Sequence, residues 1–349
     1  MTDSAAVAAV PVGPPDGSAD SGIPWHYGDP LREQRLLAGG QAIVDLSNRG
    51  VVTVSGVDRL TWLHDLTSQG LNALTPGESS LALILSPHGH VEHELHVVDD
   101  GETTWLIVQP GTAAALVDYL RSMQFMLRVE VADRSDDYAV VWEPVWESDP
   151  DAVSWLVPAD FAGRGRIDAG SDRGGDASKY VGERPADFAG REVIVPRAEL
   201  AARMSAAPAR AGSWALEALR TAAAVPRLGL ETDHRTLPHE IGWIGPGVHL
   251  SKGCYRGQEA VARVHNLGHP PRRLVLLHLD GSGEELPAHG DVVVVGEREV
   301  GWVGTAAWHF ELGPVATAIV RRSTPVDDAA IVRAASGDIA ATQETVVLP

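Results

Sequence analysis

The residues best able to do chemistry lie in one short stretch, residues 251–259, which reads Ser-Lys-Gly-Cys-Tyr-Arg-Gly-Gln-Glu. Cys254 is the only cysteine in 349 residues, so it cannot close an internal disulfide. Lys252 is one of two lysines, and arginine supplies the rest of the 28 basic residues. A compact ammonium two residues before a thiol would favour the thiolate, which is the reactive form of cysteine. The stretch therefore predicts a reactive thiol at Cys254, with Lys252 assisting it.

The residues around Cys254 predict how its loop is built. Gly253 and Gly257 bracket it, and glycine allows a sharp turn or a close backbone approach. Residues 258–266 have the pattern of a short helix, whose positive end would also favour a thiolate just before it. The alternative is that Cys254 is a small buried apolar residue, because free cysteine is among the most buried residue types.

The elements that must position this loop follow from patterning. Short strands alternate with helical segments over residues 25–270, and several strands are linked by hairpins, as at Pro87-His88-Gly89-His90. This predicts an α+β architecture of antiparallel sheets and helices. A helix is expected over residues 58–68, and another over residues 214–224 with Ser213 as its cap. No glycine-rich phosphate-binding motif is found.

The domain division follows from changes in composition. Residues 147–190, rich in Asp, Gly and Ala, are expected to be loops with one short strand at residues 154–157. Short strands broken by Gly, Pro and Asp are expected at residues 273–279, 291–295, 299–308 and 315–320, and they predict a separate C-terminal β-barrel. The expected parts are a disordered tail (residues 1–24), an α+β region (25–270, with subdomains 25–135 and 136–270) and the barrel (271–349).

Composition and charge restrict the function. A hydrophobic share of 44% over 349 residues indicates a globular protein of two or three domains. The net charge of −19 disfavours nonspecific binding to nucleic acid or to an anionic membrane. No apolar run approaches the ~20 residues that span a bilayer, and a single cysteine suits the reducing cytoplasm, where we expect the chain to reside. A local cluster of arginines near Cys254 is either a solvated face or an RNA site: Arg256, Arg263, Arg272 and Arg273.

The run Lys252-Gly253-Cys254-Tyr255-x-Gly257-Gln258-Glu259 resembles the signature of the YgfZ-type folate-binding proteins. These are relatives of the aminomethyltransferase, or T-protein, of the glycine cleavage system. The resemblance covers nearly all of the chain after the first 24 residues. Further matching motifs are Val54-Ser55-Gly56-Val57-Asp58, Leu63-His64-Asp65-Leu66-Thr67-Ser68, Pro87-His88-Gly89-His90-Val91, Pro226-Arg227-Leu228-Gly229, Thr236-Leu237-Pro238-His239-Glu240, Val300-Gly301-Trp302-Val303-Gly304 and Leu312-Gly313-Pro314-Val315-Ala316.

The resemblance implies a fold, a cofactor and a set of site residues. The fold is a T-protein-like ring of antiparallel sheet and helix segments around a central cavity, with a C-terminal β-barrel. The cavity would hold tetrahydrofolate or a one-carbon derivative of it. Cys254 and Lys252 would be the catalytic residues, and no metal is expected. The residues expected to bind the cofactor are His93, Glu94, Arg220, Trp243, Tyr255, Gln258 and Glu259.

Two departures from the family pattern bear on this cofactor. The pair His93-Glu94 stands where T-proteins carry paired aspartates, an acidic position used in methylene transfer to folate. Ala222 stands where the family has a glutamate that grips the pteridine ring, and losing a hydrogen-bonded partner costs ~1–3 kcal/mol. The first departure argues against aminomethyl transfer, and the second predicts weaker folate binding. Four histidines lie at or near the same hairpin: His88, His90, His93 and His96. They could suggest a zinc site, but His93 and His96 would face opposite sides of a strand, so we interpret the four as ordinary surface or core histidines.

Three hypotheses about function follow. The first is a folate-binding protein of the YgfZ type that assists assembly or repair of iron–sulfur enzymes as its partners, and the sequence leaves open whether it has turnover of its own. The second is a tetrahydrofolate-dependent aminomethyltransferase, with the His93-Glu94 pair supplying the acid–base function. The third is an RNA-modification-related binding protein, which the acidic total disfavours. A monomer is expected.

Overall fold

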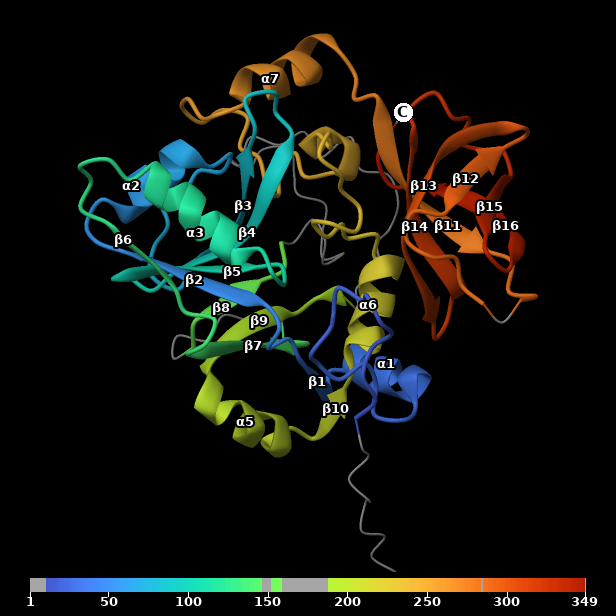
Figure 1. Cartoon of the computed structure of the whole chain (residues 1–349), viewed down its shortest axis with the longest axis horizontal. Coiled ribbons are helices and arrows are strands. Elements are labelled where there is room, and N and C mark those ends of the chain that lie inside the picture. Colours follow the sequence, from blue (N-terminus) through green and yellow to red (C-terminus); the bar gives the residue numbers. More distant parts are fainter. Residues whose placement is uncertain (1–10, 146–151, 159–187, 284, 349) are drawn as a thin grey trace, which may run out of the picture.

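The computed structural model describes residues 11–145, 152–158, 188–283 and 285–348. Two five-stranded sheets pack on one another, and a closed barrel lies beside them (Figure 1). The α-helices are α1 (Pro30–Ala38), α2 (Arg59–Leu66), α3 (Ala113–Ser122), α5 (Leu200–Ala206), α6 (Ser213–Ala222) and α7 (Gln258–Leu267). Two short 3-10 helices, η3 (Arg197–Glu199) and η4 (Pro238–Ile241), complete the described helical segments.

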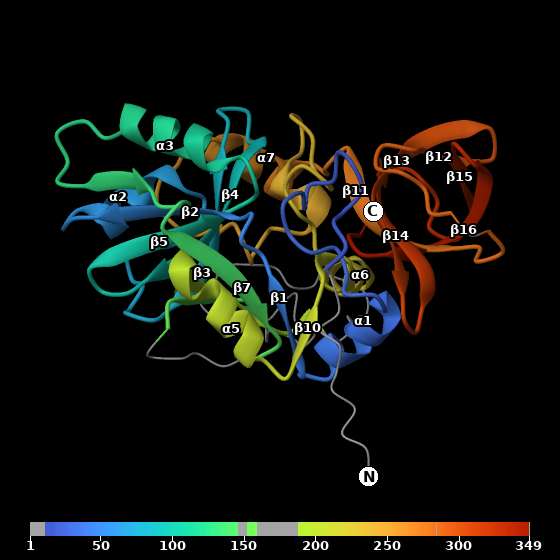
Figure 2. The same ribbon diagram turned by 60° about the horizontal axis from the view of Figure 1, so that its bottom comes forward.

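The first sheet joins segments that are far apart in the sequence. Its order is β10 (Ala209–Ala211), β1 (Ala42–Asp45), β7 (Tyr138–Glu143), β9 (Arg191–Pro196) and β8 (Ser154–Leu156). Within this sheet β1 and β10 pair in parallel, and the other pairs are antiparallel. Helix α5 covers the outer face of this sheet (Figure 2), where Met204 packs on Val141 and Val193.

The second sheet is antiparallel throughout. Its order is β3 (Ser79–Leu85), β4 (Val91–Asp99), β5 (Thr103–Val108), β2 (Gly50–Ser55) and β6 (Glu130–Asp133). Strands β3 and β4 form the hairpin that the sequence predicted, with the turn at residues 86–90. Helices α2 and α3 bury Leu63 and Leu116 against the outer face, so the inner face is left for the first sheet.

The C-terminal barrel is closed, with the strand order β11-β14-β13-β12-β15-β16. Its strands are β11 (Arg272–Leu279), β12 (Val292–Val295), β13 (Arg298–His309), β14 (Gly313–Arg321), β15 (Ala330–Ala334) and β16 (Gly337–Thr345). The sequence predicted the first four strands but not the last two. Both strands have an exposed face, and β16 carries only one large apolar residue, Ile339.

Helix α6 joins the sheets to the barrel, and it is buried along nearly its whole length. Its C-terminus closes in a Schellman motif, with Val225 N donating to Arg220 O and Ala224 N donating to Thr221 O. Ala224 takes the left-handed conformation at φ 50°, where glycine is usual. Ser213 is the first residue of the helix and makes no cap contact, because its hydroxyl donates to Pro24 O; the predicted cap is therefore wrong.

The prediction of a disordered tail over residues 1–24 is wrong for the part that the structure describes. Residues 1–10 lie outside the described residues. Val12 forms a β-bridge with His26, and Ile23 is buried in the main core. Asp20 is buried and forms an ion pair with Arg227 at 2.8 Å. A buried carboxylate with an arginine partner fixes this segment, although its composition is typical of a linker.

The division into subdomains 25–135 and 136–270 also needs correction. Strand β1 pairs with β7 and β10, so residues 42–45 belong to the same sheet as residues 138–211. Helix α1 likewise packs on α6. Most of the expected loop region, residues 147–190, lies outside the described residues, apart from β8 and the chain around Phe188. No helix formed by the described residues is long and apolar enough to cross a membrane.

A buried ionic cavity and an exposed thiol loop

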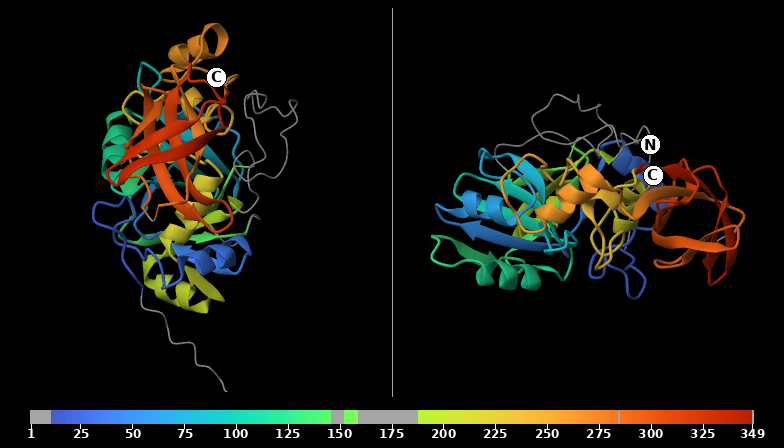
Figure 3. Two further views of the ribbon diagram at one scale, coloured as in Figure 1. Left: turned by 90° about the vertical axis from the view of Figure 1, so that its right-hand side faces the viewer. Right: turned by 90° about the horizontal axis from the view of Figure 1, so that it is seen from above.

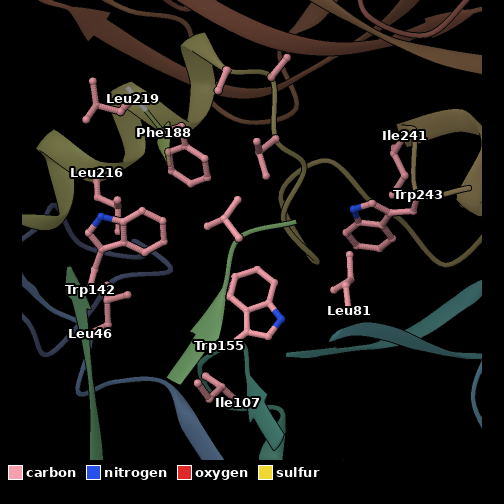
Figure 4. Packing of buried hydrophobic residues seen from close by; sticks show 14 of the residues in the cluster. Leu46, Leu81, Ile107, Trp142, Trp155, Phe188, Leu216, Leu219, Ile241 and Trp243 are labelled. Atoms are coloured by element: carbon pink, nitrogen blue, oxygen red, sulfur yellow. The ribbon is translucent and has the colours of Figure 1, made fainter. Parts of the chain in front are cut away.

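The two sheets, α6 and the loop after it line a partly open cavity of about 40 Å³. Three aromatic side chains, Trp142, Trp155 and Phe188, converge on this part of the core from separate segments (Figure 4). Trp142 and Phe188 stack at 5.1 Å between ring centroids. The polar residues that line the cavity are Arg49, Glu94, His96, Gln109, Glu192, Arg220 and Arg227.

His96 lies at the centre of these polar groups. Its Nδ1 lies 2.7 Å from Glu192 Oε2, and its Nε2 lies 3.3 Å from Glu94 Oε1. Its ring stacks on Trp155 at 3.7 Å between centroids. Burial alone would lower the pKa of His96, but Glu192 and Glu94 outweigh it and raise the pKa to about 9. His96 is therefore an imidazolium at neutral pH.

The two carboxylates beside His96 are ionised acceptors. Burial alone would raise their pKa values, but His96 is among the groups that outweigh it, lowering the pKa of Glu94 and bringing that of Glu192 to about 2. Glu94 also accepts hydrogen bonds from Gln109 Nε2 at 3.1 Å and from Leu228 N at 3.0 Å. Glu94 is thus an ionised carboxylate that carries no proton, and both of its oxygens already accept hydrogen bonds.

The same buried network extends from the sheets to the barrel. Arg227 forms ion pairs with Asp20 and Glu217, and Arg220 forms ion pairs with Glu217 and Glu231. Glu231 is fully buried. Its carboxylate accepts four hydrogen bonds, from Arg220 Nη1, Arg227 N, Thr305 Oγ1 and Thr317 Oγ1.

Arg49 is a cation of the cavity whose guanidinium is only partly engaged by the residues that the structure describes. Its side chain is 7% exposed, and its Nη2 lies 3.7 Å from Glu192 Oε1. Its Nε and Nη1 have no hydrogen-bond partner among the residues that the structure describes. Buried donors without a partner are rare in native proteins, so these two point to a ligand or to water in the cavity.

The cavity matches a reduced pterin in chemistry but not in size. Aromatic walls suit a flat ring, and the free donors of Arg49 suit its carbonyl group. However, about 40 Å³ holds roughly three water molecules at ~15 Å³ each, which is too little for a two-ring heterocycle. As bounded by the described residues, the cavity does not fit a folate unless an aromatic side chain such as Trp155 or Phe188 moves.

Residues 251–259 lie away from the cavity, at the C-terminal end of α2. The buried ammonium of Lys252 donates to three backbone carbonyls there, those of His64, Thr67 and Gln69. These carbonyls follow or end a helix, where a cation is favourable. Burial lowers the pKa of Lys252 to about 8, which still leaves it mostly charged at neutral pH. Lys252 therefore holds two segments together.

Other residues of this loop fix its shape. Gln258 Nε2 donates to Lys252 O at 3.3 Å, and the Tyr255 ring lies 5.1 Å from Lys252 Nζ. Burial raises the pKa of Tyr255 to about 12. Gly257 has φ 84°, and a Cβ there would meet Ser86 O at 2.5 Å, so this position requires glycine where the loop rests on the hairpin. Figure 3 shows α7, which follows the loop, at one end of the molecule.

Cys254 is exposed, and no hydrogen bond or ion pair to its thiol is found among the described residues. The alternative of a buried apolar cysteine is therefore excluded. The loop holds Cys254 in solvent, while the ammonium of Lys252 is used by the backbone of residues 64–69.

The structure does not bring all the predicted site residues together. Glu94 and Arg220 line the cavity, and the other seven do not. His93 contacts Tyr119 on the opposite face of β4, and Glu259 is 87% exposed and pairs with Arg263. Trp243 is fully buried near Leu81, and its indole Nε1 has no partner among the described residues.

The four arginines near Cys254 do not form a free basic patch. Arg256 pairs with Glu92, Arg263 with Glu259, and Arg272 with both Asp233 and Glu240. Arg273 is fully buried and donates to Thr324 O. Among the described residues, no group of three or more His, Cys, Asp or Glu side chains could hold a metal ion.

Replacing Lys252 with methionine is expected to destabilise the chain by about 2 kcal/mol, because three carbonyls lose a charged donor. Urea denaturation would measure this change. Lys179, the other lysine, lies outside the described residues and cannot serve as a control. Cys254→Ser is the control, because substitution of an exposed side chain without contacts should change the free energy of unfolding by less than about 0.5 kcal/mol. Equal stability of the Lys252→Met variant and the wild type would show that the three hydrogen bonds of Lys252 do not hold the two segments together.

Comparisons with known proteins agree with this architecture. Residues 23–142 match the GCVT N-terminal domain. The chain is 28% identical over 317 residues to the aminomethyltransferase of Streptomyces avermitilis, covering 85% of this chain and 83% of that protein. It is 27% identical over 261 residues to the mitochondrial iron-sulfur cluster assembly factor IBA57 homolog of Mycosarcoma maydis, covering 70% of this chain and 59% of that protein.

A solved structure shows the same fold. The aminomethyltransferase T of the glycine cleavage system from Bartonella henselae superposes with a TM-score of 0.74 at 17% identity, covering 98% of this chain and 94% of that one. The predicted α+β ring with a C-terminal barrel is thus confirmed. The chain has the fold of aminomethyltransferase T, and its residues 23–142 match the GCVT N-terminal domain.

Proposed function

We propose that this chain is a folate-binding protein of the YgfZ type that assists the assembly or repair of iron–sulfur enzymes. The observation that carries the proposal is the loop around Cys254, which is fixed by Lys252, Gln258 and Gly257 yet leaves the thiol exposed. A thiol that stands in solvent on a rigid loop suits a reaction with another protein. The similarity to an iron-sulfur cluster assembly factor supports this class.

Reduced folate is the ligand that we propose for the central cavity, and its binding requires Phe188 to move and enlarge the cavity beyond its present volume of about 40 Å³. Arg49 would donate to the carbonyl edge of the ring, and Trp155 would pack on its face. The ring would supply a one-carbon carrier or a redox-active heterocycle. Ala222 offers no carboxylate for the amino edge of a pterin, so binding is expected to be weaker than in a protein with glutamate there.

A tetrahydrofolate-dependent aminomethyltransferase is the second candidate, because several similar proteins carry that name. The geometry of Glu94 stands against it. This carboxylate is ionised, and its two oxygens already contact His96, Gln109 and Leu228 N. Proton transfer in the reaction would have to break these contacts. Methylene transfer assayed with a lipoyl carrier protein separates the two candidates, since turnover would establish the transferase.

Two measurements test the proposed function. The rate of iodoacetamide alkylation at pH 7 should be higher for the native chain than for the urea-unfolded chain; equal rates would remove the reactive thiol. In a host that lacks the chain, the activity of an aconitase-type iron–sulfur enzyme should fall, and wild type but not Cys254→Ser should restore it. Calorimetry with tetrahydrofolate and 5-formyltetrahydrofolate tests the ligand, and no heat with either would exclude folate.

A further inference from the structure

An apolar surface stands at the end of the molecule away from the barrel, where the α3–β6 loop lies beside the start of α2 (Figure 1). Its members are Val57, Met123, Phe125, Met126 and Leu127, which we call the apolar tip. Phe125 is 92% exposed, Met126 99% and Val57 71%. Single exposed apolar residues are common, but five in contiguous segments of one protein mark an interaction site.

The tip is held by side-chain hydrogen bonds to its backbone. Trp62 Nε1 donates to Met123 O, and Gln124 Nε2 donates to Val129 O at 2.6 Å. Arg128 binds Asp58 through both its guanidinium and its backbone N–H, which ties the loop to the segment that carries Val57. A surface fixed before binding loses little conformational entropy when a partner docks.

Phe125 is held outward against its own backbone preference. Its φ is 35°, in the left-handed region that a bulky side chain rarely adopts. A glycine would take this conformation without strain. Strained backbone of this kind persists where the surrounding structure fixes it, as at binding sites. The strained backbone at Phe125 therefore holds an aromatic ring in solvent.

We propose that the apolar tip docks a protein partner that offers an apolar pocket with carboxylates at its rim. Phe and Met are the side chains that anchor such contacts, Met because it adapts to irregular pockets. The stretch from Arg121 to Arg128 begins and ends with arginine and contains no acidic residue, in a chain of net charge −19. Asp58 neutralises Arg128, whereas Arg121 donates to the neutral carbonyl of Val131.

Other occupants suit the tip less well. With ~150–250 Å² for a large side chain, the five residues expose roughly 600 Å². Docking against any partner would then bury about 1,200 Å² in all, the lower limit for a stable complex. Two copies would in addition bring their arginines together, which like charge opposes. A lipid surface of anionic composition would repel a chain of net charge −19.

The tip and the thiol loop lie at the two ends of one short helix. Val57 precedes α2, and Lys252 binds the carbonyls at its C-terminal end; its 8 residues span about 12 Å at ~1.5 Å per residue. Arg256 also packs over the ring of Tyr119, which lies one helical turn before Met123. A partner bound to the apolar tip would thus lie near the thiol loop. That Cys254 then acts on this partner rests on the proposed function.

The first test places a photoreactive benzoylphenylalanine at position 126 of the full chain in its host. A discrete adduct with another protein is expected, and its yield should fall roughly tenfold when Phe125→Ser is added. The same label at position 312, where Leu312 is 43% exposed in the barrel, is the matched control and should give none. An adduct only with a second copy or with lipid, or equal yields at both positions, would overturn the proposal.

The second test uses charge. Met126→Glu should abolish the adduct formed by benzoylphenylalanine at position 123, whereas Met126→Lys should preserve it, because the rim of the pocket is acidic. The opposite order would refute the stated chemistry. Met126 is exposed, so neither change should alter the thermal midpoint. Phe125→Gly should leave the midpoint unchanged or raised while it removes the adduct; a lower midpoint would show that the ring serves folding.

The experiments can contradict the proposed function and the docking surface independently. If the Phe125→Ser variant loses the adduct and also fails to restore the iron–sulfur enzyme, docking serves the proposed function. If the adduct forms but wild type restores nothing, the proposed function is wrong and the docking surface stands. Full restoration by Phe125→Ser, with the adduct lost, would show that the docking surface exists but does not serve the proposed function.

Discussion

Replacing Glu231 with alanine is expected to destabilise the folded chain by about 4 kcal/mol, because removing one member of a buried ionic network leaves an uncompensated charge. Glu231 is fully buried and accepts hydrogen bonds from Arg220, from the backbone of Arg227 and from Thr305 and Thr317 of the barrel. Without it, the guanidinium of Arg220 keeps Glu217 but loses its second carboxylate. Urea denaturation followed by tryptophan fluorescence would measure the loss.

Two variants calibrate this result. Glu231→Gln keeps the shape and some of the acceptors, so it should lose about half as much stability. Glu344→Ala removes a barrel carboxylate that is 47% exposed and paired with His278, and should change stability by less than about 0.5 kcal/mol. A loss below about 1 kcal/mol for Glu231→Ala would show that the network does not join the barrel to the sheets. Unfolding in two steps would instead show that this carboxylate makes the two parts cooperative.

Local patterns were enough to predict most of the fold. The β3–β4 hairpin and α2 follow from alternation, helical spacing and turn residues within one short segment. The first four barrel strands follow from the same signals. The parallel pairing of β1 with β10 could not be predicted this way, since its partners lie more than 160 residues apart. The burial of Asp20 depends likewise on Arg227, which no local pattern reveals.

The candidate site was predicted only in part, for a related reason. The motif at residues 252–259 is contiguous, so its sequence identified the thiol loop. The cavity is assembled from side chains of both sheets, α6 and the loop after it, including Arg49, His96 and Glu192. One signal was available: His96 and Glu94 alternate on β4, which places them on one face of the strand. That their face is buried follows only from tertiary packing.

Lys252 lies in the motif that the sequence analysis identified, but its contacts differ from the predicted role of assisting the thiol. Its position two residues before Cys254 suggested an ammonium that acts on the thiol. The structure shows it bound to three carbonyls at the end of α2, so its charge fixes the loop. An ammonium carries three donors on one atom, which suits three carbonyls that converge on one point.

His96 should make the stability of the chain fall as the pH rises from 6.5 to 9. Its pKa is raised from 6.5 to about 9 in the folded state, so the folded chain holds the proton more tightly. The stabilisation is complete below pH 6.5 and is lost as the pH passes 9; about 2.5 pKa units correspond to roughly 3 kcal/mol. The pKa of Lys252 is lowered to about 8, so its loss of a proton above pH 8 makes the free energy of unfolding rise with pH. The effect of His96 must therefore be measured as the difference between the wild type and a variant.

His96→Gln is that variant, and it keeps the Lys252 contribution unchanged. The difference in unfolding free energy between wild type and His96→Gln should be largest near pH 6 and shrink toward pH 9.5. Glu192→Gln keeps the histidine but removes the carboxylate 2.7 Å from its Nδ1, so the pH dependence should weaken and the NMR titration of His96 should move to lower pH. A difference that stays constant with pH would mean that His96 is neutral, and that the cavity is held by packing on Trp155 and not by charge.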